Sequence, residues 1–188
     1  EIRSNLGAAL VQAGRVEEGI RVLRQCLSEN PRLAGAHHGL GSALASQGEL
    51  AAAETEFTEA IRLGEPASLL LRSRARAQRN DLEGAKADLD ELLGQREDAF
   101  ARVDRARLRY QIWKATSSRS SLDELRRAMR EDVERALALD PQQPYVLENA
   151  GHFYMLNGGY ARAAELWRAL IAKDPGARER IGEALAEA

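Results

Sequence analysis

Apolar residues recur along most of the chain at the three- and four-residue spacing of amphipathic helices, and short segments with glycine or polar residues separate these stretches. The pattern repeats itself, because residues 6–31 align with residues 40–66 at a shift of 34 residues. The aligned pairs are apolar or small, and they include Leu6/Leu40, Gly7/Gly41, Ala9/Ala43, Leu10/Leu44, Gly14/Gly48, Leu23/Phe57 and Cys26/Ala60. A fixed period of this length predicts a repeat architecture.

Each repeated stretch predicts two helices joined by a glycine turn. Gly14 and Gly48 mark the turn, and Pro31 and Pro66 follow the second helix, which they cannot continue. Gly7 lies on the first helix, as does its counterpart in the next repeat. We expect the two helices to approach closely there, because a larger side chain would hold them apart.

The same pattern returns near the carboxyl end, where residues 150–175 carry Gly151, Tyr154, Gly158, Ala163, Trp167 and Pro175 in the corresponding positions. This arrangement resembles the tetratricopeptide repeat family, whose units are 34-residue helix–turn–helix hairpins with small and large packing positions and a closing proline. The resemblance implies an all-α fold, a right-handed α-solenoid of stacked hairpins.

The middle of the chain departs from the period. Residues 80–93 predict a second helix, displaced by 32 residues from its predecessor, and Arg76 in the preceding helix takes a position where the family usually has an aromatic residue or leucine. Residues 98–114 predict a long first helix with an apolar stripe of Val103, Ala106, Tyr110 and Trp113. A polar loop, 116–121, follows, and Ser121 with Glu124 predicts a capping box for the next helix.

These elements predict one array over residues 1–188. The expected repeats span residues 1–33, 34–65, 66–97, 98–143 (irregular, with the loop 116–121) and 144–177, and a capping helix spans 178–188. A capping helix is expected because the last repeat of a solenoid has an exposed apolar face.

Composition narrows the possible functions. The chain has 188 residues, of which 44% are hydrophobic and 30% charged, and a net charge of −2 argues against a dedicated nucleic-acid binder. The sequence has no run of 18 apolar residues that would predict a membrane segment, and its single cysteine, Cys26, cannot form an internal disulfide. We expect a cytoplasmic protein, and the bias toward Ala, Arg and Leu is typical of a bacterial source.

No catalytic or metal-binding constellation is evident in the sequence. His37 and His38 are adjacent and point about 100° apart on a helix, so they cannot share one metal, and His152 is distant in sequence. Cys26 occupies a small-residue position and is predicted to be buried and inert. The carboxylates are predicted to lie on solvated helix faces, with no isolated pair for acid–base chemistry. We therefore expect no enzyme activity, no metal and no cofactor.

The family resemblance implies a concave groove, lined mainly by first helices, that holds a peptide or an extended segment of a partner protein. The positions that it assigns to this groove include His38, Ser42, Leu70, Arg74, Gln78, Tyr145, Glu148 and His152. Some members of the family bind the carboxyl terminus of chaperones through a Lys and Asn clamp. Ser4 and Ala8 occupy the corresponding positions in the first repeat and cannot provide that cation, so we exclude a chaperone clamp.

Arginines cluster on two predicted first helices. Arg72, Arg76 and Arg79 form one stripe, and Arg102, Arg105 and Arg109 form a second, while the helix over residues 82–93 is acidic. One interpretation is that the arginines pair with neighbouring acids. Another is a basic stretch of groove, including Arg105 and Arg109, that attracts an acidic segment. A third, nucleic-acid binding, is disfavoured because the run lacks aromatic residues for base stacking.

Together these observations predict a non-catalytic scaffold that binds a peptide or an extended partner segment in its groove, with an acidic segment as one possibility. An alternative is the interaction or regulatory region of a larger enzyme, such as a bacterial transferase. The start of the chain at Glu1, inside a helical pattern and without a methionine, motivates this alternative.

Overall fold

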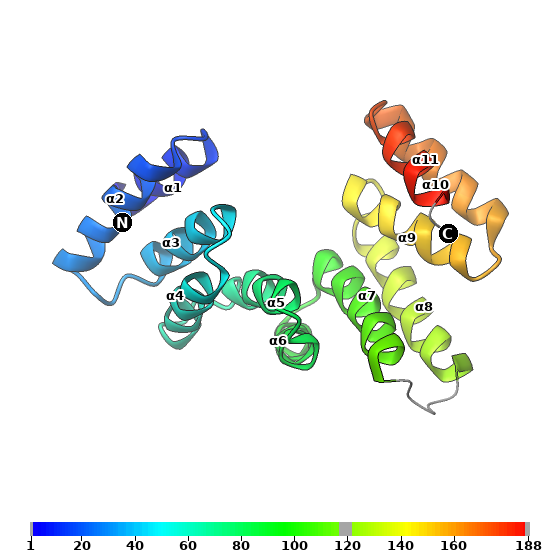
Figure 1. The fold of residues 1–188 in the computed structure, drawn as a ribbon, viewed down its shortest axis with the longest axis horizontal. Coiled ribbons are helices and arrows are strands. Elements are labelled where there is room, and N and C mark those ends of the chain that lie inside the picture. Colours follow the sequence, from blue (N-terminus) through cyan, green and yellow to red (C-terminus); the bar gives the residue numbers. More distant parts are fainter. Residues whose placement is uncertain (1, 117–121, 187–188) are drawn as a thin grey trace. The chain divides into compact units, whose positions relative to one another are not determined.

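The fold is all-α in a computed structural model that describes residues 2–116 and 122–186. The described residues form eleven helices: α1 (Ile2–Gln12), α2 (Val16–Glu29), α3 (Ala34–Ser46), α4 (Leu50–Arg62), α5 (Ser68–Gln78), α6 (Leu82–Gln95), α7 (Ala99–Thr116), α8 (Leu122–Leu139), α9 (Pro144–Leu156), α10 (Tyr160–Lys173) and α11 (Ala177–Ala186) (Figure 1). Loop residues 117–121 and the Ser121 half of the predicted capping box lie outside the described residues.

The helices group into two compact units, an N-terminal unit (Glu1–Leu92) and a C-terminal unit (Leu93–Ala188). In the N-terminal unit, α1 packs on α2 and α3 on α4, and α3 also packs against α1, α2 and α5. In the C-terminal unit, α7 packs on α8 and α9 on α10, and α9 also packs against α7 and α8. Within each unit, therefore, consecutive helical hairpins stack on one another, as the repeat pattern predicts.

Four of the hairpin turns share one backbone geometry. Gly14, Gly48 and Gly158 have φ values of 80°, 80° and 77°. In each turn, the backbone N–H of the next residue donates a hydrogen bond to a carbonyl in the last turn of the first helix. Asn80 takes this position between α5 and α6 with φ 65°, and the Asp81 N–H bonds the Arg76 carbonyl at 2.9 Å. Asparagine tolerates the left-handed conformation better than other side chains, so the third hairpin keeps the same turn without a glycine.

The predicted close approach of paired helices is confirmed. A Cβ added to Gly7 would lie 2.7 Å from Leu23 Cγ, and one added to Gly41 would lie 2.7 Å from two ring carbons of Phe57. At Gly151 the added atom would lie 2.2 Å from Trp167 Nε1. In these three hairpins the first helix therefore presents bare backbone to a large side chain of the second helix.

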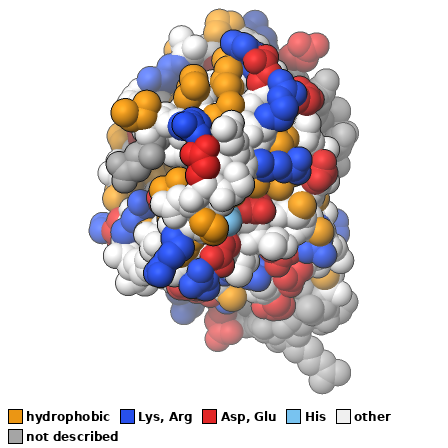
Figure 2. Space-filling model, turned by 90° about the vertical axis from the view of Figure 1, so that its left-hand side faces the viewer, with side chains coloured by type: hydrophobic (Ala, Val, Ile, Leu, Met, Phe, Trp, Pro, Cys, Tyr) orange, Lys and Arg blue, Asp and Glu red, His pale blue; other side chains and the backbone are white. Residues whose placement is uncertain are grey.

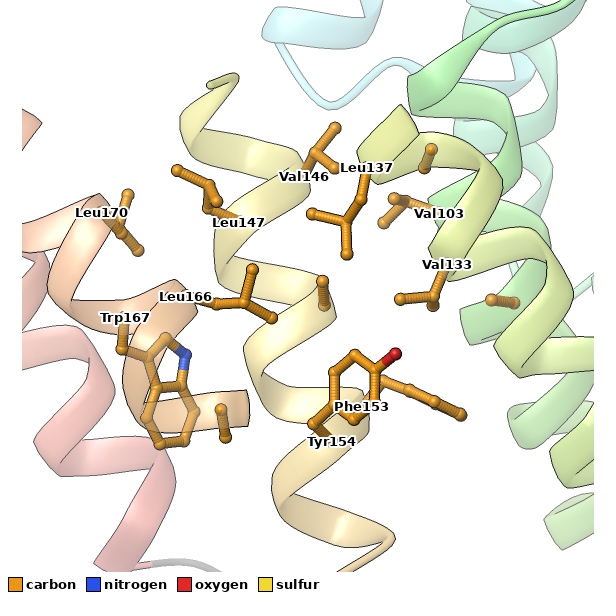
Figure 3. Close-up of a cluster of buried hydrophobic side chains, with 14 of the residues drawn as sticks. Val103, Val133, Leu137, Val146, Leu147, Phe153, Tyr154, Leu166, Trp167 and Leu170 are labelled. Carbon is orange, nitrogen blue, oxygen red and sulfur yellow. The ribbon is translucent and has the colours of Figure 1, made fainter. Parts of the chain in front are cut away.

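Each unit has an apolar core between its hairpins. In the C-terminal unit, Leu166, Trp167 and Leu170 of α10 lie on one side of α9, and residues of α7 and α8 lie on the other (Figure 3). Ala177 and Ile181 of α11 also belong to this core. In the N-terminal unit, the core includes Leu23, Leu40 and Phe57, and Cys26 is buried, as predicted.

Candidate functional site

The first helices of adjacent repeats lie side by side in the N-terminal unit. Nδ1 of His38 on α3 is hydrogen-bonded to the hydroxyl of Ser68, the first residue of α5, at 2.8 Å, and the imidazole also meets the edge of Phe57. Burial lowers the pKa of His38 below its ordinary value, against a smaller opposing effect of the Glu65 carboxylate. His38 is therefore a polar link between two first helices and favours the neutral imidazole.

The other predicted groove residues of this unit are partly accessible. Ser42 of α3 and Leu70 and Arg74 of α5 are half-buried, and Gln78 is exposed at the end of α5. They lie on α3 and α5, the helices that His38 and Ser68 join. Both polar and apolar side chains are thus available on this pair of first helices.

The first arginine stripe is paired with carboxylates of neighbouring helices. Arg72 and Arg76 on α5 both bind Asp88 of α6, with Arg72 Nη2 and Arg76 Nη1 at 2.7 and 2.8 Å from Oδ1. Arg76 and Arg79 also bind Glu54 of α4. Arg76, which replaces the usual large apolar residue, is thus accommodated by two carboxylates.

The second arginine stripe has the same arrangement in the C-terminal unit. Arg102, Arg105 and Arg109 of α7 all bind Asp132 of α8, whose side chain is only 1% exposed. Arg102 also binds Glu97, with Nε 2.9 Å from the carboxylate. Arg105 and Arg109, predicted for the groove, therefore both reach the second helix of their own hairpin.

The expectation that the carboxylates lie on solvated helix faces is wrong for three of them. Asp88, Asp104 and Asp132 are 2%, 2% and 1% exposed, respectively. Each has a partner that offsets the cost of burying its charge: Asp88 and Asp132 bind the arginines described above, and Asp104 accepts a hydrogen bond from the Tyr145 hydroxyl and pairs with Arg107. These carboxylates bind neighbouring helices together.

Tyr145 joins the first helices of the C-terminal unit. It lies on α9, and its hydroxyl donates a hydrogen bond to Asp104 of α7. Its ring stacks on Phe100 of α7 with centroids 5.5 Å apart. The predicted groove residue Tyr145 is therefore the counterpart of His38, because each links the first helices of two successive hairpins.

The remaining predicted residues follow Tyr145 on α9. Glu148 is half-buried, and its Oε2 lies 3.4 Å from Nη2 of Arg180 on α11. The rings of His152 and Trp167 meet in an edge-to-face arrangement with their centroids 5.5 Å apart. His152 also lines a cavity of about 440 Å³. The structure thus divides the predicted groove residues between the units: five lie on α3 and α5, and five on α7 and α9.

The cavity is the feature that the sequence prediction did not identify as a site. It lies between α7, α8 and α9, and its walls include Tyr110, Trp113, Leu125 and Met129. The apolar stripe of the long first helix was the available signal, because it reaches Trp113, past the 13 residues of α3 and α9. Which residues would face them could not be predicted from the sequence.

The described residues contain neither a cluster of metal-ligating side chains nor a membrane-spanning helix. In residues 2–116 and 122–186, no group of three or more His, Cys, Asp or Glu side chains is arranged to hold a metal ion. None of the helices in these ranges combines the length and the apolar character needed to span a bilayer. On the face shown in Figure 2, basic and acidic side chains lie next to one another, with hydrophobic side chains between them. No large area of that face carries charges of only one sign.

Comparison with known proteins agrees with this architecture. Residues 34–63, which contain α3 and α4, match the family model described as tetratricopeptide repeat. A search of curated proteins found no match.

Among the solved structures that are similar to the chain, three share 18% sequence identity with it. TTC0263, a thermophilic TPR protein of Thermus thermophilus, matches with a TM-score of 0.74 over 97% of this chain and 96% of its own. Pseudomonas aeruginosa PilF matches with a TM-score of 0.75, over 91% of this chain and 74% of its own. YrrB, a TPR protein with an unusual peptide-binding site, matches with a TM-score of 0.61 over 91% and 84%.

At this level of identity the similarity establishes the fold. It confirms the predicted all-α solenoid of helix–turn–helix repeats. The chain therefore carries a tetratricopeptide repeat at residues 34–63 and has the all-α repeat fold of the tetratricopeptide repeat family.

Proposed function

We propose that the chain is a non-catalytic scaffold that binds a peptide or an extended segment of a protein partner along the first helices of its repeats. The observation that carries this proposal is the side-by-side contact of first helices within each unit. The His38–Ser68 hydrogen bond joins α3 to α5, and the Tyr145–Asp104 hydrogen bond joins α7 to α9. A segment lying across such joined helices would meet side chains from more than one repeat.

The residues on these helices suit an extended polypeptide. Ser42, Arg74 and Gln78 offer hydrogen-bonding groups, and Leu70 offers an apolar contact, all with part of their surface accessible. YrrB, one of the structures with the same fold, is described as having a peptide-binding site, which is consistent with this use of the fold. The buried carboxylates support a non-catalytic role, since each is held by arginine or tyrosine.

We propose an acidic segment because arginines gather on the first helices α5 and α7. In the N-terminal unit, Arg72, Arg76 and Arg79 share two carboxylates at hydrogen-bonding distance, Asp88 and Glu54. In the C-terminal unit, three arginines of α7 share Asp132 and Glu97. Arg74, half-buried on α5, adds a further cation beside the first cluster.

The experiment is a selection from a random peptide library displayed on phage, with the whole chain as bait. Selected peptides are then measured by fluorescence anisotropy against the wild type, Leu70→Asp and Arg74→Glu. Arg24→Glu is the matched control, because Arg24 is exposed on the second helix α2. We expect at least a tenfold loss of affinity in the two first-helix variants, which corresponds to about 1.4 kcal/mol, and no loss in Arg24→Glu.

Salt adds a second test of the same proposal. If the segment is acidic, its affinity should fall steeply as ionic strength rises, because the attraction between accessible charges is screened. Thermal melts of each variant verify that the chain is folded. Peptides that bind Leu70→Asp and Arg74→Glu as tightly as the wild type would place the binding surface elsewhere and contradict the proposal.

A further inference from the structure

The cavity of about 440 Å³ in the C-terminal unit lies where α9 ends. Its lining includes Leu156 and Asn157 at the end of α9, Trp113 near the end of α7 and Leu122 at the start of α8. Helices α7 and α8 have 18 residues each, whereas α9 has 13. The additional residues of the α7–α8 hairpin thus leave the end of its apolar stripe, at Tyr110 and Trp113, without cover from the shorter helix α9.

The cavity has an apolar floor and an apolar mouth. Val103, Val133 and Phe153 line it and belong to the buried core of the unit. Tyr110, Leu122 and Leu156 also line it and are 37%, 36% and 59% exposed, respectively. Large apolar side chains at this exposure are unusual when they share one concave surface, and such surfaces typically mark binding sites.

Positive charge flanks the mouth. Arg107 and Arg126 line the cavity, and their side chains are 46% and 49% exposed. Each has an acidic neighbour on its own helix, with Arg107 Nη2 3.3 Å from Asp104 and Arg126 Nη1 3.9 Å from Asp123, and neither acid lines the cavity. Among the described residues that line the cavity none is Asp or Glu, although the whole chain has more acidic than basic residues.

We propose that this cavity holds one large apolar side chain of a protein segment whose flanking residues are acidic. The inference rests on the proposed function and adds a specific anchor site to it, in a part of the chain that departs from the regular repeat. A polypeptide fits better than a small molecule, because a ligand confined to the cavity would leave Leu156 and Tyr110 exposed at the mouth. A segment that passes over the mouth covers these residues and brings its carboxylates to Arg107 and Arg126.

The test is a peptide-library selection on the wild-type chain with counter-selection on Leu156→Asp. Leu139→Asp is the matched control, since Leu139 and Leu156 are exposed leucines that each end a helix, and only Leu156 lines the cavity. We expect peptides with a large apolar residue beside Asp or Glu. Their affinity should fall at least tenfold in Leu156→Asp and in Arg126→Glu and stay unchanged in Leu139→Asp.

A spectroscopic readout locates the bound peptide. The chain has two tryptophans, Trp113 in the cavity wall and Trp167 against Gly151, so fluorine-labelled tryptophan gives two assignable NMR signals. Peptide binding should shift the Trp113 signal more than the Trp167 signal. A larger shift at Trp167, or peptides that bind Leu156→Asp as tightly as Leu139→Asp, would overturn the proposal.

The same variants separate this inference from the proposed function and from other occupants. Peptides that are sensitive to Arg74→Glu but not to Leu156→Asp would retain the first-helix surface and remove the cavity as an anchor site. Binding of decanoate to the cavity, with no peptide dependent on Leu156, would make it a small-molecule site. A wild-type dimer that Leu156→Asp converts to a monomer would make the occupant a second copy of the chain. Each of these results overturns the proposal.

Discussion

Arg72 of α5 holds the Asp88 carboxylate of α6 with two hydrogen bonds, one from Nε at 3.1 Å and one from Nη2 at 2.7 Å. The two side chains are 11% and 3% exposed, so the pair lies almost entirely inside the hairpin. Arg76 adds a further bond to the same carboxylate. Asp88 therefore binds two guanidinium groups that the fold has removed from most of their water, and Arg76 has Glu54 as a second carboxylate.

Loss of this carboxylate should destabilise the N-terminal unit strongly. Asp88→Ala leaves Arg72, which is 11% exposed, without its carboxylate and removes one of the carboxylates that Arg76 binds, and we expect the free energy of unfolding to fall by about 3–5 kcal/mol. Asp90→Ala is the control in the same helix, because Asp90 is 40% exposed and pairs with Lys86 at the surface, where such a pair contributes about 0.5 kcal/mol. Urea unfolding measures both. Equal losses in the two variants would contradict a buried ionic role for Asp88.

A methyl group should have opposite effects at two glycines of α3. Gly41→Ala places a Cβ 2.7 Å from Cδ1 and Cε1 of Phe57, which is fully packed, and we expect a loss of about 1–3 kcal/mol. At Gly35 an added Cβ meets no heavy atom of the described residues within 4 Å, so Gly35→Ala should stabilise the helix by up to about 1 kcal/mol. Thermal melting compares the two. A raised Tm in Gly41→Ala would show that the close approach is not required.

Acid should weaken the N-terminal unit through His38. Burial lowers the pKa of His38 in the folded chain below its ordinary value, so the folded state binds this proton less readily than the unfolded state. The stabilisation by neutral His38 is complete above the unfolded pKa of about 6.5 and is lost as pH falls through the folded pKa. NMR titration should give an imidazole pKa below that of a free histidine. The loss of stability on acidification should be smaller in His38→Gln. A pKa at or above the free value would contradict this.

Tyr154 should titrate late in alkali. Burial, with the hydrogen bond to Glu134 and its charge, raises the pKa of Tyr154 to about 12. Because the folded value lies above that of the unfolded chain, the contribution of Tyr154 to stability is present below about pH 10 and is lost as pH rises through the folded pKa. Phenolate absorbance should show a late step that is missing from Tyr154→Phe. An identical titration curve for this variant would refute the assignment.

The repeat itself could be predicted from the sequence because it depends on local residue types. Glycine at positions 7, 41 and 151 has one packing role in three hairpins, and a period in the sequence reveals it directly. Asn80 was not recognised as the equivalent of the turn glycines. It is a different residue type, in a repeat whose spacing has shifted, and only its φ of 65° identifies the shared turn.

The candidate site was less predictable, because it depends on pairs of distant residues. The arginine stripes were evident from their helical spacing, but that spacing does not say which side chains of another helix they meet. Asp132 lies 27 residues from Arg105, and nothing near it in the sequence distinguishes it from an exposed aspartate. The cavity depends on the relative lengths of three helices, which the predicted stripe of Tyr110 and Trp113 indicated only in part.

The matched lengths of α7 and α8 show how a repeat array can change without losing its register. Both helices have 18 residues, so the residues added to one arm of the hairpin are balanced by residues added to the other. Both helices still pack against α9, and Trp113 near the end of α7 and Leu122 at the start of α8 line the cavity. A solenoid can therefore acquire a new surface by lengthening one hairpin, independently of the side chains that its repeats place along the first helices.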